Sequence, residues 1–423
     1  MVTGMGFRGR SIGLGRQFVV FSLLGLALLG LSGASLGTAV RPAAADDSKP
    51  APKDPPLLLQ LPAVSATQIA FTYAGDLWIV PREGGEARRL TAGVGLESYP
   101  VFSPDGKSIA FAGEYEGNLD VYVIPAAGGV PVRVTHHPDP DVPVGWTNDG
   151  KEIIFRSPRH SYGRFLRLFT VPATGGPATE LPLPMAEAGS LSPDGKRIVY
   201  VPYSNKPQFP GPMRPLKNYR GGSASPIWIA DLADSSITKV ERKDSTDFDP
   251  MWIGDTIYFL SDREGPMALF ACDVAGKGIR RVLDPKDAGG DIKSASACAD
   301  AIVFDRFGTV NLFDLKTQKS KQVPIHVNAD LPSVRPKFVK AAHAIQGVDL
   351  SPSGARAVFE AHGEILTVPA EKGDVRNLTH TVGGPSAIRP GRRTANRSPI
   401  SRTNRASIGC TFARRTARAK PRC

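Results

Sequence analysis

The stretch YPVFSPDGKSIAFAGEYEGNLDVYVIPAAGGVPVRVT, from Tyr99 to Thr135, decides the fold. In its S-P-D-G turn, Pro104 fixes φ, Asp105 bonds to nearby backbone and Gly106 closes the turn. The alternating run that follows predicts a strand with one buried face. D-V-Y-V predicts the next strand, P-x-x-G-G a hairpin turn in which Gly supplies positive φ, and the V-R-V-T ending an outer strand.

The same unit recurs along the chain. Thr147 lies between the turn serines Ser103 and Ser192 in steps of 44 and 45 residues, a period that suits four-stranded propeller blades. Further copies begin with IAFTYAGDLWIV at Ile69, DPMWIGDTIYF at Asp249, ADAIVFDRF at Ala299 and VDLSPSGARAVF at Val348. No helical period competes with them. We therefore expect an all-β fold, a six-bladed β-propeller of four-stranded blades over 59–342, followed by the first blade of a second, truncated propeller over 343–384.

The N-terminus predicts export. A positively charged segment precedes an apolar run from Phe18 to Leu31, and small residues lead to Ala43-Ala44-Ala45, an A-x-A cleavage pattern. Residues 1–45 are therefore interpreted as a signal peptide, with an uncleaved anchor as the alternative, and 46–58 as a Pro-rich linker. We expect an exported protein, periplasmic or secreted.

The basic character of the chain belongs to its ends. The formal net charge is +12, of which residues 385–423 supply +11 and residues 46–384 supply −3. A nucleic-acid function would have to rest on this disordered basic tail alone.

The sequence motifs do not combine into a recognisable active site. The chain has no G-x-S-x-G or H-E-x-x-H motif, and its four cysteines show no C-x-x-C spacing. Cys272 and Cys298 are expected to be buried free thiols, with a disulfide between them as the alternative. A possible metal cluster in an exposed inter-blade loop comprises His136, His137, Asp139 and Asp141. We expect no catalytic residue, no metal and no cofactor.

One insertion stands out, from Pro202 to Ser225, between two strands that a short turn would normally join. Long loops on rigid scaffolds often carry function. Its candidate residues for contact with another domain or with a passing peptide are Lys206, Arg214, Lys217, Tyr219 and Arg220. A merely solvated loop is the alternative.

The blades IAFTYAGDLWIVPREGGEARRLT, the insertion ending YRGGSASPIWIADL and the segment GEILTVPAEKGDVRNLTHT together resemble the tricorn protease family and its exported bacterial homologues, over about 59–383. The resemblance implies a six-bladed propeller, a seven-bladed propeller, a PDZ domain and a serine-protease core, in a homo-oligomer whose propellers route peptides to that core. In members of this family the catalytic residues lie in the C-terminal half of the chain, so none is carried over to this sequence.

The tail can be tested against that resemblance. Suitable codons for residues 385–423, read two bases out of register, yield a string with S-P-D-G-K and two strands where the next blade should fall. We therefore interpret the tail as an out-of-frame translation and expect no nucleic-acid partner. The predicted function is that of a non-catalytic propeller fragment, inactive alone, which would gate and route unfolded peptides. The alternative is a TolB-like periplasmic interaction propeller.

Overall fold

The computed structural model describes residues 57–161, 163, 165–204, 219–242, 244–283, 291–335, 342–361 and 363–379. Beyond these it describes only three strands, which pair antiparallel: β31 (Ser386–Ile388), β32 (Ser398–Arg402) and β33 (Ser407–Cys410). The predicted signal peptide, nearly all of the linker and most of the basic tail lie outside the described residues. The domain boundaries and the disorder of the tail therefore stay predictions.

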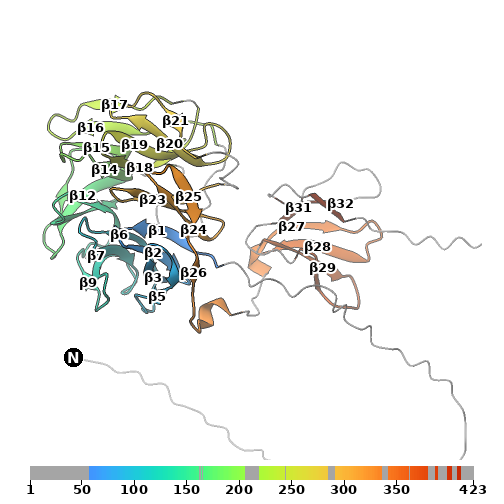
Figure 1. Cartoon of the computed structure of the whole chain (residues 1–423). Helices are drawn as coiled ribbons and strands as arrows, with labels where there is room; N and C mark the ends of the chain where they lie inside the picture. Colours follow the sequence, from blue (N-terminus) through green and yellow to red (C-terminus); the bar gives the residue numbers. More distant parts are fainter. Residues whose placement is uncertain are drawn as a thin grey trace, which may run out of the picture. The chain divides into compact units, whose positions relative to one another are not determined.

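Between Gln60 and Gln322 the described residues form six antiparallel sheets of four strands each (Figure 1). In chain order the sheets are β1 (Gln60–Val64), β2 (Gln68–Tyr73), β3 (Asp76–Pro81) and β5 (Arg88–Arg89); β6 (Glu97–Phe102), β7 (Ser108–Gly113), β8 (Asp120–Pro125) and β9 (Val132–Arg133); β10 (Val142–Trp146), β11 (Glu152–Ser157), β12 (Arg167–Pro172) and β13 (Thr179–Glu180); β14 (Ala188–Leu191), β15 (Arg197–Val201), β16 (Trp228–Asp231) and β17 (Ile237–Lys239); β18 (Asp247–Ile253), β19 (Thr256–Ser261), β20 (Ala268–Asp273) and β21 (Arg280–Arg281); and β22 (Ser294–Ala297), β23 (Ala301–Arg306), β24 (Thr309–Asp314) and β25 (Lys319–Gln322). Each sheet is one sequence repeat.

The sheets are arranged in a ring. Their first strands, β1, β6, β10, β14, β18 and β22, contact one another in that order, and β22 in turn contacts β1. The helical elements of the described residues are two short 3-10 turns, η1 (Pro332–Val334) and η2 (Ala342–Ala344). The predicted all-β propeller architecture is confirmed, because only such a ring gives every sheet two packed neighbours.

Apolar side chains from successive sheets hold the ring together. Where its two ends meet, Phe71 and Trp78 of the first sheet share one buried cluster with Val303 and Leu312 of the last. Each is almost completely buried, and full burial of such a side chain contributes about 1.5–3 kcal/mol. Packing between sheets therefore contributes several kcal/mol to the free energy of ring closure.

A short parallel pair completes the closure. Strand β26 (Ile325–His326) pairs with β4 (Gly85–Glu86), and the Gly85 N–H donates to Pro324 O at 2.8 Å. Gly84 has φ +97°, and a Cβ there would overlap Pro324. In Figure 1 the orange β26 accordingly lies beside the blue first sheet. A glycine is needed because two chain segments meet here at backbone distance.

The predicted turns take the expected form. Ser103 Oγ donates to Asp105 Oδ1 at 2.7 Å, the Lys107 N–H donates to the same oxygen at 3.0 Å, and Gly106 has φ +70°. Asp120 plays a different part: it begins a strand and pairs with Arg133 at 2.7 Å across the sheet. The acidic residues of the repeat therefore divide into turn residues and strand-to-strand ion pairs.

A seventh four-stranded sheet follows the ring in sequence and comprises β27 (Ile345–Leu350), β28 (Arg356–Ala361), β29 (Glu364–Pro369) and β30 (Arg376–Asn377). It repeats a detail of the second sheet: Thr379 Oγ1 accepts the Ile365 N–H at 3.0 Å, as Thr135 Oγ1 accepts the Val121 N–H at 3.0 Å. Its first strand is largely exposed, and the exposed fraction of Leu350 is 65%. The sheet thus has blade-like bonding without a buried first strand.

Candidate functional site

The centre of the ring holds a cavity of about 610 Å³. Residues from the first strands of all six sheets line it, from β1 and β6 through to β18 and β22. Most of its wall is apolar or small, and the aromatic contributors include Tyr99, Phe102, Trp146 and Trp252. The described part of the chain therefore encloses an apolar channel with a few polar groups, the usual composition of a binding cavity.

The strands that line this channel are locally distorted. The pairing register shifts within β1, β6, β10 and β18, as in a β-bulge. Leu61, Tyr99 and Asp249 have φ between +47° and +53°, and each precedes a proline. Positive φ is uncommon for residues other than glycine, and bulges re-aim side chains next to functional sites. The distortion places these three residues on the channel wall.

Charged groups on the wall are engaged with neighbouring sheets. The Arg156 guanidinium lies 4.8 Å from the centre of the Tyr99 ring and donates from Nη1 to Glu187 O at 3.3 Å. Asp249 Oδ2 accepts the Ala295 N–H at 3.2 Å. Arg156 and Asp249 thus place a positive and a negative group on the channel wall, each connecting neighbouring sheets, and Glu187 is a second acidic residue of the lining.

Two buried carboxylates lie at the start of first strands: Asp141 immediately precedes β10, and Asp247 is the first residue of β18. Arg159 pairs with Asp141 in the third sheet, and Arg263 pairs with Asp247 at 3.1 Å in the fifth. Each arginine also covers an aromatic pair, and for Arg263 the ring centres of Phe259 and Phe270 are 5.1 and 5.3 Å away. Burial raises the pKa of both aspartates, and the arginines oppose that rise. Such desolvated pairs favour a structural role.

The second sheet carries Glu97 in the corresponding place, beside Tyr115 rather than an arginine. Glu97 is fully buried, and neither carboxyl oxygen has a hydrogen-bond partner of standard geometry among the described residues. Burial raises the pKa of Glu97 to about 7, which the nearby Tyr115 hydroxyl only partly offsets. This carboxyl therefore titrates near neutral pH.

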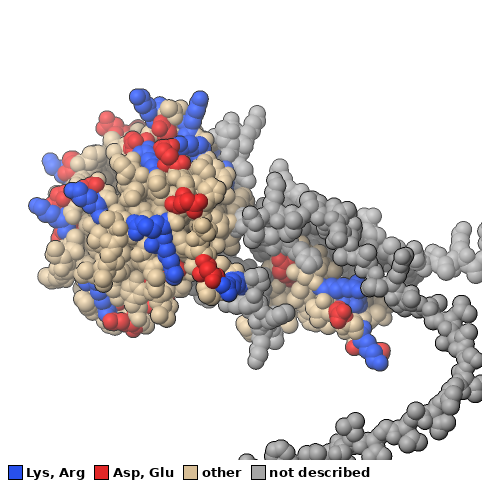
Figure 2. All heavy atoms as spheres, turned by 60° about the horizontal axis from the view of Figure 1, so that its bottom comes forward, with Lys and Arg blue, Asp and Glu red and all other residues tan. Residues whose placement is uncertain are grey.

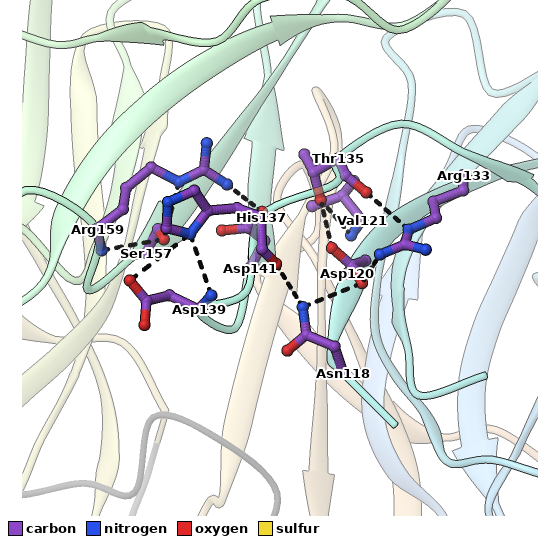
Figure 3. A network of polar contacts seen from close by, with 10 residues as sticks. All are labelled: Asn118, Asp120, Val121, Arg133, Thr135, His137, Asp139, Asp141, Ser157 and Arg159. Atoms are coloured by element: carbon purple, nitrogen blue, oxygen red, sulfur yellow. Dashed lines mark hydrogen bonds and ion pairs between the residues drawn. The ribbon is translucent and has the colours of Figure 1, made fainter. Parts of the chain in front are cut away.

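Figure 3 shows His137, Asp139 and Asp141, three of the four residues of the predicted His and Asp cluster, together with their neighbours. His137 Nδ1 accepts the Asp139 N–H at 3.0 Å, and His137 O accepts from Asn118 Nδ2 at 2.5 Å, while Asp141 faces Arg159. The described residues contain no group of three or more His, Cys, Asp or Glu side chains placed to hold a metal ion. The contacts in this loop tie strands together.

The predicted contact residues of the insertion are only partly described. Lys206, Arg214 and Lys217 lie outside the described residues. Arg220 donates from Nη1 to Asp262 Oδ2 at 2.6 Å and from Nη2 to Asp262 O at 3.2 Å, and Tyr219 is half-buried. Arg220 therefore fixes the end of the insertion to the fifth sheet.

Cys272 and Cys298 are both free thiols, with Cys272 buried and Cys298 half-buried. The alternative of a disulfide between them is wrong. Burial raises the pKa of the Cys272 thiol to about 12 and also raises that of Cys298. Both thiols are consequently protonated, and unreactive, near neutral pH.

The sequence motifs described above do not point to the channel residues. The sequence does contain a pattern that marks these residues. In four repeats a proline lies in the first strand, before the turn to the second strand, in the segments LPAV, YPVF, VPVGW and DPMW. The distribution of charged residues does not mark a site, because Lys and Arg side chains intermingle with Asp and Glu on the face shown in Figure 2. In the described residues no helix is long and apolar enough to cross a membrane.

A closed ring of four-stranded sheets around an apolar channel defines a β-propeller protein. The family model for the tricorn protease N-terminal beta propeller domain matches residues 56–319. The chain therefore belongs to that family, and the resemblance inferred from its blades is confirmed.

Curated relatives agree with this assignment. The chain is 28% identical over 337 residues to tricorn protease homolog 1 of Streptomyces coelicolor, covering 78% of this chain and 30% of the relative. It is 26% identical over 285 residues to the tricorn protease homolog of Saccharolobus solfataricus, covering 66% and 25%. A crystal structure of the tricorn protease matches the fold with a TM-score of 0.58 and 22% identity over 82% of this chain and 33% of that one. The chain thus spans about a third or less of these proteins.

Proposed function

We propose that this chain is a non-catalytic propeller portion of a tricorn-like serine protease, whose channel admits unfolded peptides and routes them to a protease core. The observation that carries the proposal is the apolar channel lined by all six first strands. An extended chain presents apolar side chains that such a wall can contact, whereas a folded protein keeps them buried. The partners are unfolded peptides and the protease and PDZ domains of a homo-oligomeric parent, in an exported, periplasmic or secreted location.

Site-specific photocrosslinking tests where a peptide enters. A benzophenone side chain replaces Tyr99 on the channel wall or, as a control, Val132, which is 59% exposed on the outer strand β9. A reduced, carboxymethylated protein serves as the unfolded probe, and its native form is the second control. We expect crosslinks to the unfolded probe only, and only at Tyr99. Equal crosslinking at both positions, or crosslinking of the native probe, would contradict the proposal.

An activity measurement tests the non-catalytic part. The purified chain is expected to leave fluorogenic peptides intact, since the sequence offers no serine-protease motif. Cleavage that is lost on substituting a residue of this chain would refute it.

A further inference from the structure

We propose that the channel wall is built to prevent strand pairing, so that an extended polypeptide touches it through side chains alone and slides without a fixed register. This inference rests on the proposed function and states how the channel holds its peptide. It follows from the way in which hydrogen bonding is blocked at the free edges of the six first strands.

Each first strand is an edge strand. In every sheet it pairs on one side only, with the second strand, and its other side lines the channel. A free edge of this kind presents unpaired N–H and C=O groups, which usually bind an extended peptide as an added strand. A ring of six such edges would hold a passing chain strongly and in register.

Prolines interrupt four of these edges. Pro62, Pro100, Pro143 and Pro250 lie within β1, β6, β10 and β18 and line the channel. Each lacks the N–H that an added strand would need, and the same four strands carry the register shifts. A bulge leaves one residue unpaired and twists the edge, so regular pairing cannot continue past it.

Side chains from neighbouring sheets occupy further edge groups. The Trp252 N–H donates to Ser190 Oγ at 3.0 Å, and the Ala295 N–H donates to Asp249 Oδ2 at 3.2 Å. Trp146 Nε1 donates to Val101 O at 3.1 Å. These three bonds join β18 to β14, β22 to β18 and β6 to β10, so the ring itself uses backbone groups that a peptide would otherwise take.

The two first strands without a proline are short. Strands β14, with sequence AGSL, and β22, with sequence SASA, have four residues each, and each takes part in one of the bonds between neighbouring sheets. What remains accessible is apolar and aromatic surface, including the half-buried Tyr99 and Trp146. Contacts with such surfaces are non-directional, which permits sliding.

The experiment compares two fluorescent probes in binding to the full chain. One is an alternating Val-Thr peptide of about ten residues, long enough to span a strand. The other is the same peptide with alternate amides N-methylated, which removes the donors needed for pairing. Fluorescence anisotropy gives both affinities for the wild type, for the double variant P143A/P250A, and for the control P125A, whose proline is exposed at the end of β8.

The wild type and P125A are expected to bind the two probes with equal affinity, weak or strong, to within about twofold. P143A/P250A is expected to favour the unmethylated probe by about fivefold or more, since one net hydrogen bond corresponds to roughly two- to tenfold in affinity. A wild-type preference of that size, or a double variant without one, would overturn the inference. If circular dichroism shows that the double variant is unfolded, Ser190→Ala, which releases the Trp252 N–H, takes its place. Failure of the Tyr99 crosslink, in contrast, counts against the proposed function.

Discussion

Replacing Arg263 with Met is expected to destabilise the ring far more than an ordinary charge deletion. Arg263 and Asp247 are 7% and 1% exposed, and their side chains meet at 3.1 Å. Asp247 also accepts from Ser245 Oγ at 3.0 Å and Ser261 Oγ at 2.5 Å. Methionine keeps apolar contact with the aromatic pair beneath, so the change isolates the loss of the charge.

The expected cost at pH 8 is about 3–5 kcal/mol of unfolding free energy, the usual result of leaving one member of a buried pair without its partner. The cost should shrink at lower pH. Burial raises the pKa of Asp247 and Arg263 opposes that rise, so the variant carries an aspartate with a still higher folded-state pKa. A group whose pKa is higher in the folded state loses stability as pH rises from the unfolded value toward the folded one. R263M should therefore be relatively more stable at pH 5 than at pH 8.

Urea unfolding at the two pH values, followed by tryptophan fluorescence, gives the free energies for R263M, D247N and the double variant. The double variant should lose less stability than the two single losses together, by about 2 kcal/mol, because the residues are directly coupled. The control K321M removes an ion pair whose members, Lys321 and Glu83, are 56% and 77% exposed, and should cost at most about 0.5 kcal/mol. A loss below about 1 kcal/mol for R263M, independence from pH, or strict additivity would refute the reasoning.

Three further outcomes are expected. The pKa of Glu97 is about 7 in the folded state against the ordinary 4.5, so the wild type should lose up to about 3 kcal/mol of stability as the pH rises from about 4.5 to 7. In Glu97→Gln this carboxyl is absent, so the melting temperature should fall less over the same pH range. Parallel pH profiles of the two proteins would contradict this. Gly84→Ala should cost about 2 kcal/mol more in urea unfolding than Gly117→Ala, since both have positive φ but only Gly84 faces Pro324. Amides of 345–369 should exchange with deuterium faster than those of 108–125, since β27 is exposed, and equal protection would argue otherwise.

The turns and strands were predictable because they depend on short sequence separations. Asp105 and Gly106 form their turn with residues within a few positions, so S-P-D-G identifies it wherever it occurs. The pair of Asp247 with Arg263 spans 16 positions, yet comparing F-L-S-D-R at 259–263 with F-R-S-P-R at 155–159 would have indicated it. Each of these segments follows an aspartate that lies at the start of a first strand. Repeats expose such contacts only when they are aligned with one another.

Other features depend on the closed ring and could not be predicted locally. The pairing of Ile325 with Gly85 joins segments from opposite ends of the propeller, and only closure brings them together. The positive φ of Tyr99 likewise has no signature of its own in YPVF, because a proline in a strand is equally compatible with an undistorted edge. The charged insertion is therefore more conspicuous in the sequence than the channel is, although in the structure Arg220 is engaged with Asp262.

The way the ring uses its polar groups bears on what its channel can select. In the hydrogen bonds from Trp252 to Ser190 and from Ala295 to Asp249, backbone N–H groups of the wall connect neighbouring sheets. A wall whose polar groups are engaged in this way contacts a bound polypeptide mainly through apolar surface. Apolar contacts discriminate only weakly between peptide sequences. On the proposed function, this propeller would therefore separate extended chains from folded ones by width and flexibility, and the choice of cleavage site would have to be made by residues outside the channel.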